Sequence, residues 1–379
     1  MSNGQTQLNS ASTAGAEAGD ARQAGLKVVV LYGGNSGERE VSLVSGRNVA
    51  GVLEQEGFDV LLLDTGQGGK AEEPLGFAPV VTALQDFAPD VVFIALHGKG
   101  GEDGSMQGLL ELLGIPYTGS GILASSLAMD KERSKLFYRD QGLSVPPSIC
   151  VRPEDALSPA LATAAPTATT AAPAPQAAAA ATATPATAAP ATTIKPTLLQ
   201  RVQEEVGIPC VVKPVAEGSS LGVYIVRQPE ELAAALAAAF AISDELMIER
   251  FIQGREVTVS VLGNDEPWAL PVIEIIPHAE FYDYQAKYAE GGSTHVCPAE
   301  LPPAWTETCQ RHAVLAHKAL GCRGMSRTDF IFDAEGTPWV LESNLIPGMT
   351  GTSLLPDAAR AAGLTAGQLY RKLIDYALE

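Results

Sequence analysis

The chain has 379 residues, of which 46% are hydrophobic and 18% charged, so it is long enough for two or three domains with buried cores. Its longest aliphatic runs, such as 27–32 and 91–96, are far shorter than the roughly 20 residues of a membrane-spanning helix. A net charge of −19 argues against a nucleic-acid surface, because such a surface needs clustered Lys and Arg. An anionic ligand would have to be met by a few placed cations.

The first 24 residues are polar and lack the apolar stretch of a secretory signal, so we expect a disordered tail on a cytoplasmic protein. The five cysteines are scattered and odd in number. They indicate reduced thiols, and they fit neither a disulfide framework nor a zinc site.

Residues 25–120 alternate short aliphatic strands with amphipathic helices. A strand over 27–32 enters a glycine turn, a helix over 39–57 follows, and further strands are expected over 58–64 and near 91–96. This β-α-β order predicts an α/β domain with a doubly wound parallel sheet.

A central domain is expected over 121–252, with a first helix near 129–142. It is interrupted by 159–193, where 35 residues contain 18 Ala, 9 Thr and 6 Pro and carry no charge. Recurring prolines prevent a long helix, and small side chains bury too little area to offset ordering entropy. We expect a mobile linker or surface loop; a short alanine helix at 176–181 is the alternative.

The remaining sequence predicts an α+β domain over 253–379. Two strands meet at a bend at Gly254, and a polar, aromatic loop covers 278–303. A helix over 304–320, a hairpin over 325–344 and a final helix near 364–378 complete it. His312 and His317, on the helix over 304–320, are expected at the surface.

The hairpin carries the most specific chemical signal. If Asp333 pairs with Pro338, then Phe332 opposes Trp339, Asp329 opposes Glu342 and Arg327 opposes Asn344. One face then carries Arg, Asp, Glu and Asn, and the other carries Phe330, Phe332, Trp339 and Leu341. Two carboxylates and an amide at cross-strand distance suit Mg²⁺, which prefers few protein oxygens and substrate phosphates. The alternative is a solvated polar face.

Two glycine-rich loops are weaker signals. In 213–223, a lysine at a strand end precedes a Gly-Ser loop, which would let backbone N–H groups and an ammonium approach phosphate oxygens. In 97–108, His97 begins a loop at a strand end where ligands commonly bind. No GxxxxGK[ST] pattern or GxGxxG pattern occurs, so a P-loop and a nicotinamide site are both disfavoured.

In order along the chain, eight segments resemble the D-alanine–D-alanine ligase family of the ATP-grasp superfamily. They are GGNSGEREVSLVSG, HGKGGEDGSMQG, MDKERSK, VVKPVAEGSSLGV, GREVTV, YDYQAKY, RTDF and ESNLIPGMTGTSLLP. The resemblance covers about 25–379 apart from the insert. It implies an N-terminal α/β domain followed by a two-part ATP-grasp module that clamps ATP between its halves.

The resemblance also implies a reaction. Such enzymes join two D-alanines for peptidoglycan precursors, with ATP converted to ADP and phosphate through an acylphosphate. A homodimer and two Mg²⁺ (or Mn²⁺) ions are implied as well. Asp329, Glu342 and Asn344 would hold the metal ions. The ATP phosphates would be neutralised by Lys131, Lys213 and Lys287. Adenine would be contacted by the segment at the bend, Glu249, Arg250, Phe251 and Ile252, and the ribose hydroxyls by Glu256.

For the amino acids, the resemblance implies that Glu38 and His97 lie at the first D-alanine, and that Ser353 and Leu354 hold the second. Catalytic roles would fall to Glu38, Ser219, Tyr288, Arg327, the backbone N–H of Gly348, and Ser353. An acylphosphate is destroyed by water, so a closing loop is required, and 281–298 has the aromatic residues and paired glycines for it.

The chain departs from the family pattern at Leu345, where Thr usually follows the metal-binding Asn. Three alternatives stay open: a D-alanyl-D-lactate or D-alanyl-D-serine ligase, an ATP-grasp ligase for other substrates, and a non-catalytic nucleotide-binding protein. The pair Lys287-Tyr288 resembles that of dipeptide-forming members and favours D-alanine.

Deleting residues 159–193 is expected to leave kcat nearly unchanged, because Ala, Thr and Pro side chains offer no group for acid–base or phosphoryl chemistry. The measurement is phosphate release from ATP with D-alanine, for the full chain and the deletion variant side by side. A large loss of kcat in the deletion variant would refute this prediction.

Overall fold

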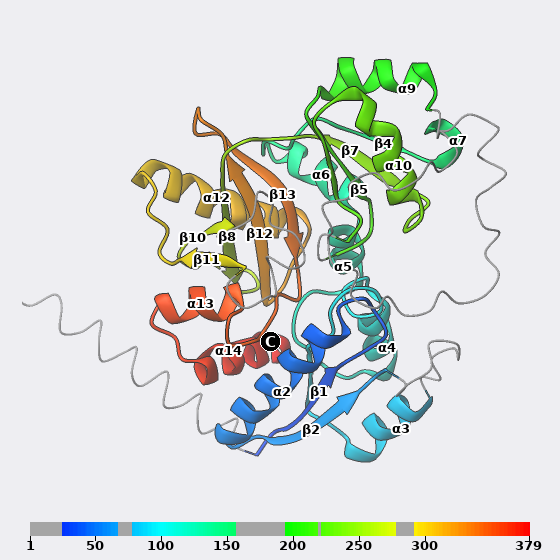
Figure 1. Ribbon diagram of the computed structural model, residues 1–379. Coiled ribbons are helices and arrows are strands. Elements are labelled where there is room, and N and C mark those ends of the chain that lie inside the picture. The colour runs from blue at the N-terminus through cyan, green and yellow to red at the C-terminus, as the bar shows by residue number, and fades with distance from the viewer. Residues whose placement is uncertain (1–24, 67–77, 157–193, 219–220, 278–291) are drawn as a thin grey trace, which may run out of the picture.

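The computed structural model describes residues 25–66, 78–156, 194–218, 221–277 and 292–379, which form three β-sheets with helices around them (Figure 1). The predicted tail and the predicted insert lie outside the described residues. In the described part of the chain, none of the helices combines the length and apolar character that crossing a bilayer requires.

The first sheet is parallel, with strand order β2-β1-β3, as the β-α-β order predicts. Its strands are β1 (Lys27–Tyr32), β2 (Asp59–Asp64) and β3 (Val91–Ile94). Its helices are α2 (Arg39–Gln55), α3 (Ala78–Phe87) and α4 (Ser105–Leu113). Residues 28–31 and 91–94 are fully buried, because the helices cover the sheet.

The last helix of the chain, α14 (Ala366–Leu378), packs against α2 and β3 (Figure 1). Its residues Leu369 and Tyr370 belong to the same buried cluster as residues 28–31. The ring of Tyr370 meets that of Phe93 edge-on, with 5.6 Å between centroids. The first sheet and helix α14 therefore share one core.

The second sheet is antiparallel, with strand order β4-β7-β5-β6. Its strands are β4 (Ser148–Val151), β5 (Cys210–Pro214), β6 (Tyr224–Val226) and β7 (Leu246–Arg250). Helix α10 (Leu232–Phe240) packs on β5 and β6. Helices α5 (Ile122–Met129) and α6 (Lys131–Asp140) precede this sheet in the chain. Its strands are connected through α7 (Pro153–Ala156), α9 (Pro196–Arg201), the π-turn η1 (Val202–Val206) and the 3₁₀ turn η2 (Pro229–Glu231).

The third sheet is also antiparallel, with order β11-β10-β8-β12-β13 and β9 paired to β8. Its strands are β8 (Arg255–Leu262), β9 (Trp268–Ala269), β10 (Ile273–Pro277), β11 (Ser293–Val296), β12 (Met325–Phe332) and β13 (Pro338–Asn344). Helix α12 (Pro303–Ala319) covers one face, and α13 (Leu354–Ala361) contacts β8. On β8, odd-numbered valines face α12, while Glu256 and Thr258 face the opposite side.

The β12–β13 hairpin confirms half of the predicted register. Asp329 pairs with Glu342 and Arg327 with Asn344, as expected. Beyond Asp329 the register shifts at a β-bulge, so Phe332 pairs with Pro338, and the predicted pairing of Phe332 with Trp339 is wrong. The bulge also places Val340 in the core instead of Leu341, which turns to the opposite face.

The expected surface position of His317 is also wrong, since its side chain is buried and its Nδ1 lies 2.8 Å from Ser326 Oγ. The reason is helical spacing: Ala313, Ala316 and His317 lie on one face of α12, and that face packs on the sheet. Burial lowers the pKa of His317 to about 4, so this ring is neutral.

Replacing Gly254 by Ala is expected to destabilise the protein. A Cβ at this bend between β7 and β8 would overlap the carbonyl oxygen of Phe332, and such overpacking costs about 1–3 kcal/mol. Gly51→Ala is the matched control, because a Cβ there meets no atom within 4 Å and alanine favours helix α2. Thermal melting should show a lower midpoint for Gly254→Ala only; equal midpoints for both variants would contradict the steric argument.

Candidate active site

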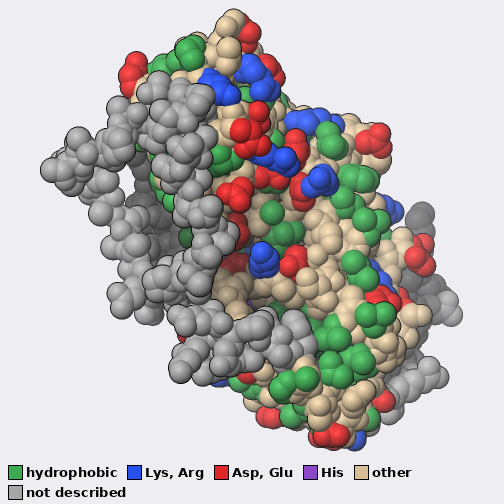
Figure 2. All heavy atoms as spheres, turned by 90° about the vertical axis from the view of Figure 1, so that its right-hand side faces the viewer, with side chains coloured by type: hydrophobic (Ala, Val, Ile, Leu, Met, Phe, Trp, Pro, Cys, Tyr) green, Lys and Arg blue, Asp and Glu red, His purple; other side chains and the backbone are tan. Residues whose placement is uncertain are grey.

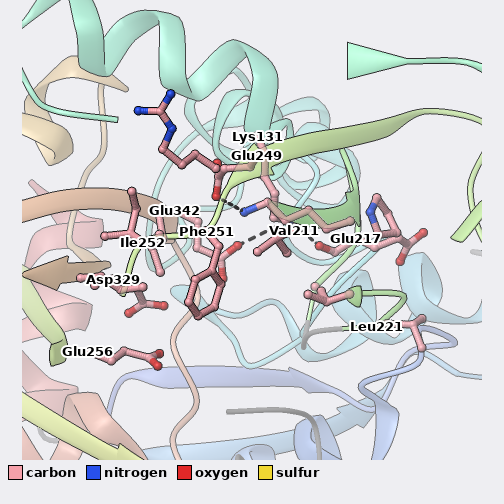
Figure 3. A pocket seen from close by; sticks show the side chains of 17 residues that line it. Lys131, Val211, Glu217, Leu221, Glu249, Phe251, Ile252, Glu256, Asp329 and Glu342 are labelled. Atoms are coloured by element: carbon pink, nitrogen blue, oxygen red, sulfur yellow. Dashed lines mark hydrogen bonds and ion pairs between the residues drawn. The ribbon is translucent and has the colours of Figure 1, made fainter. Parts of the chain in front are cut away.

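A pocket lies between the second and third sheets (Figure 3). Strands β5, β7, β8, β12 and β13 and the start of α6 all contribute to its walls. Many predicted nucleotide and metal residues line it: Lys131, Lys213, Glu249, Arg250, Phe251, Ile252, Glu256, Asp329 and Glu342. The structure thus brings together residues that are up to 211 positions apart, from 131 to 342.

The pocket has apolar walls and charged ends. Val211, Leu221 and Val223 come from the second sheet and its loop, and Ile331 and Leu341 come from the third. In Figure 3, Asp329 and Glu256 lie at one end of the pocket, and Glu217 and Leu221 lie at the other. A flat ring between apolar side chains, with charged groups beyond it, would suit this shape.

The Asp329 carboxylate is the most heavily bonded group of the site. Arg327 donates to both of its oxygens, through Nε and Nη2, each at 2.9 Å. Thr258 Oγ1 donates to Oδ1 at 2.6 Å, and Asn344 Nδ2 donates to Oδ2 at 3.1 Å. Arg327 therefore compensates the charge of Asp329, and the fork geometry fixes both side chains.

The donor chemistry fits a hard divalent cation. Asp329 and Glu342 are opposite each other on one sheet face, and the amide of Asn344 bonds to Asp329. Among the described residues, there is no group of three or more His, Cys, Asp or Glu side chains that could hold a metal ion. Two carboxylates and an amide are few ligands, which suits Mg²⁺ or Mn²⁺ shared with phosphate oxygens.

Two lysines bring positive charge into the pocket. Lys131 Nζ donates to Glu217 O at 2.6 Å and lies 3.4 Å from Glu342 Oε2. Lys213 Nζ donates to Glu249 Oε1 at 2.8 Å. Sequence reasoning missed a third lysine, Lys135, which forms a buried ion pair with Glu249. The signal was its spacing: Lys131 and Lys135 are four residues apart and share a helix face.

On the face shown in Figure 2, Lys and Arg side chains stand among Asp and Glu side chains on the upper part of the molecule. The described atoms of this face show no broad basic area. The cations that could meet an anionic ligand are instead those placed in the pocket.

Glu38 and His97 approach each other at the carboxyl ends of β1 and β3. His97 bonds through Nε2 to Ser45 Oγ and through Nδ1 to Ile346 O, both at 3.1 Å. Burial lowers its pKa, so the ring is neutral, although the charge of Glu38 opposes this. A Cβ at Gly98 or Gly218 would lie 2.8 or 2.9 Å from Glu38 Oε2, so glycine permits the close approach at both positions.

Glu102 was also missed, although it lies inside the glycine-rich segment 97–108. Its Oε2 accepts a hydrogen bond from Gly98 N at 2.7 Å. Burial, and then the negative charge of Glu38, raises the pKa of Glu102 to about 8. Two carboxyl groups therefore share this corner, and one of them holds its proton at neutral pH.

The remaining predicted residues fall into two groups. Ser353 precedes α13 and accepts a hydrogen bond from Thr350 N at 3.0 Å; Gly348 lies against its hydroxyl, and Leu354 is buried. This loop is fixed to α2 because Asn48 Nδ2 donates to Met349 O at 2.6 Å. Ser219, Lys287 and Tyr288 lie outside the described residues, as does most of the expected closing loop.

Comparisons with known proteins agree across most of the chain. Residues 78–120 match the family model "D-ala D-ala ligase N-terminus", and residues 181–375 match "D-ala D-ala ligase C-terminus". The D-alanine--D-alanine ligase of Pelotomaculum thermopropionicum is 42% identical over 354 residues, which are 93% of this chain and 97% of the relative. That of Ruegeria pomeroyi is 46% identical over 357 residues, 92% of this chain and 95% of the relative.

Solved structures give the same result. The D-alanine--D-alanine ligase of Bacillus anthracis complexed with ATP matches with a TM-score of 0.70 at 29% identity, over 93% of this chain and 97% of that one. The VanG D-Ala:D-Ser ligase of Enterococcus faecalis matches with a TM-score of 0.69 at 30% identity, over 93% and 99%. The fold is therefore shared with both kinds of ligase.

Glu102→Gln is expected to make stability less dependent on pH between about 4.5 and 8. In the folded chain Glu102 keeps its proton up to about pH 8, whereas its ordinary pKa is 4.5, so the folded state binds the extra proton and stability falls as pH rises through this window. Glutamine is neutral throughout. Urea unfolding at several pH values measures the slope.

Asp103→Asn is the matched control. Burial opposes ionisation of Asp103, but hydrogen bonds from Ser105 N and Gly100 N prevail and lower its pKa below 3.8. Its contribution to stability is present above that value and lost only in stronger acid. The control should therefore change the slope below about pH 4 alone. An unchanged slope in Glu102→Gln would show that Glu102 does not carry the extra proton.

Proposed function

The chain belongs to the D-alanine–D-alanine ligase family, and we propose that it joins two D-alanines to D-alanyl-D-alanine, with ATP converted to ADP and phosphate. The observation that carries this proposal is the pocket itself. Lys131 from α6 and Lys213 from β5 line it together with Asp329 and Glu342 of the third sheet. That arrangement suits a triphosphate held both by ammonium groups and by metal-binding carboxylates.

Nucleotide binding follows from the two walls of the pocket. Lys131 and Lys213 would neutralise phosphates, and the segment 249–252, with its apolar neighbours, would hold adenine. Glu256 would accept hydrogen bonds from ribose hydroxyls. Asp329, Glu342 and Asn344 would hold two Mg²⁺ or Mn²⁺ ions, which when bound supply charge compensation for the transferring phosphate.

The amino acids would bind at the other end of the cleft. Glu38 would receive the ammonium of the first D-alanine, beside His97. The carboxylate of the first D-alanine would take the γ-phosphate of ATP and release ADP. The amine of the second D-alanine would then attack the acylphosphate carbon, and phosphate would leave as the peptide bond forms. Arg327 and the N–H of Gly348 would stabilise the oxyanion, a term worth several kcal/mol in a dry site. Ser353 and Leu354 would hold the second carboxylate.

The parts of this proposal that rest on the resemblance alone concern Ser219, Lys287 and Tyr288, which would close the site with the segment 281–298. The division into three parts at 120/121 and 252/253 and a homodimer are proposed on the same ground. A cytoplasmic location, where ATP and peptidoglycan precursors are made, is supported by the five cysteines, all of which are free thiols.

Two alternatives deserve a test. The likeness to a D-Ala:D-Ser ligase keeps D-serine open as the second substrate, whereas the curated relatives carry the dipeptide-forming name. A non-catalytic nucleotide-binding protein would have no need for an arginine fork on Asp329 or for Glu342 opposite it. Both features are present, so we favour the enzyme.

The deciding experiment is a product assay with ATP, Mg²⁺ and D-alanine, run beside L-alanine, D-serine and D-lactate. When D-alanine is the substrate, D-alanyl-D-alanine, ADP and phosphate should be formed in equal amounts. Glu342→Gln should abolish turnover at unchanged melting temperature, because the amide removes a negative metal ligand. Phosphate release without D-alanine dependence would reject the ligase, and near-normal activity of Glu342→Gln would reject the metal assignment.

A further inference from the structure

Glu249 lies between two lysines at the back wall of the pocket. Lys213 Nζ donates to its Oε1 at 2.8 Å, and Lys135 Nζ forms an ion pair with its Oε2. The side chain of Glu249 is only 3% exposed, and those of Lys135 and Lys213 are 1% and 11% exposed. One buried carboxylate therefore has two ammonium partners, one on each oxygen.

The two lysines differ in what they can reach. Lys213 and Glu249 line the pocket, whereas Lys135 does not. Lys135 comes from α6, one turn after Lys131, and sits behind Glu249 with respect to the cavity. A ligand in the pocket can contact Lys213, but Glu249 separates it from Lys135.

This arrangement has a consequence for charge when a nucleotide enters. If Lys213 turns towards a phosphate, Glu249 loses one of its two partners. A carboxylate buried without a partner is strongly disfavoured, because it has left water and gained no compensating charge. With Lys135 in place, Glu249 stays paired when Lys213 turns towards a phosphate.

We propose that Lys135 is a positioning residue for nucleotide binding, which keeps Glu249 compensated so that Lys213 can exchange the carboxylate for a phosphate. The inference rests on the proposed function, because it takes the pocket to bind ATP. Lys135 itself touches neither phosphate nor adenine. Its effect passes entirely through Glu249.

Burial, followed by the positive charges of Lys213, Arg139 and Lys131, lowers the pKa of Lys135. The charge of Glu342 opposes this lowering, and the ion pair with the Glu249 carboxylate also favours the ammonium form of Lys135. Lys135 and Glu249 therefore depend on each other, and removing one leaves the other uncompensated. That dependence makes a double substitution informative.

The test compares binding of ADP and of adenosine by isothermal calorimetry. In Lys135→Met, Lys213 is held by an otherwise unpaired carboxylate, so ADP affinity should fall roughly 10- to 100-fold. Adenosine has no phosphate and does not require Lys213 to move, so its affinity should be unchanged. In turnover assays, KM for ATP should rise while kcat at saturating ATP and KM for D-alanine stay close to the wild-type values.

Two further variants separate this role from a general loss of structure. In Glu249→Gln, Lys213 no longer faces a carboxylate, so the identity of residue 135 should cease to matter: Lys135→Met/Glu249→Gln and Glu249→Gln should bind ADP equally. This comparison holds even if Lys135→Met alone does not fold. Lys318→Met, on the exposed side of α12, controls for the substitution itself.

Equal ADP affinity in folded Lys135→Met and the wild-type chain would overturn the inference. So would an equal loss of ADP and adenosine affinity, or a large difference between the double variant and Glu249→Gln. These results would leave the ligase reaction standing. A wild-type chain that binds no ADP would instead overturn the proposed function, and this inference with it.

Discussion

The site depends on two carboxylates held on adjacent antiparallel strands. Asp329 and Glu342 face the same side of the third sheet at a cross-strand distance where like charges repel unless a cation compensates them. In this structure Arg327 and Lys131 supply that compensation, from β12 and from α6. Strands β12 and β13, helix α6 and the second sheet therefore meet at Asp329 and Glu342, and the other residues of the pocket lie around these two carboxylates.

The protein is strongly acidic, yet its functional cations are few and sheltered. Lys131, Lys135 and Lys213 all contact acidic or carbonyl oxygens at the pocket, and each is largely buried. In such surroundings an ammonium is screened little by salt, so the two lysines that line the pocket, Lys131 and Lys213, act more strongly on a bound phosphate than surface lysines would. The net charge of −19 therefore says little about what the pocket attracts.

Much of the fold followed from local patterns. Apolar alternation and a polar turn were enough to predict the parallel strands, the hairpin and the pairing of Asp329 with Glu342. The β-bulge was not predicted from the sequence. An extra residue in one strand does not change the apolar pattern of either strand taken alone, so the pairing of Phe332 could be known only once the partner strand was placed. His317 was wrongly expected at the surface because the prediction used only its spacing from His312. Ala313 and Ala316 define the packed face of α12, and His317 lies on that face.

The missed site residues share one cause. Lys135 and Glu102 gain their character from burial and from Glu249 and Glu38, which come from distant parts of the chain. The four-residue spacing of Lys131 and Lys135 indicates a shared helix face, but it gives no sign of Glu249 as the partner of Lys135. Tertiary contacts of this kind set charge states, and a linear pattern does not contain them.

The shared core of α14 and the first sheet bears on how the chain is made. Residues 25–120 leave the ribosome well before Leu369 and Tyr370, which cover part of that sheet. Until Leu369 and Tyr370 have emerged, part of the apolar surface of the first sheet stays uncovered. The first sheet therefore completes its core only after the long intervening stretch of chain has been synthesised.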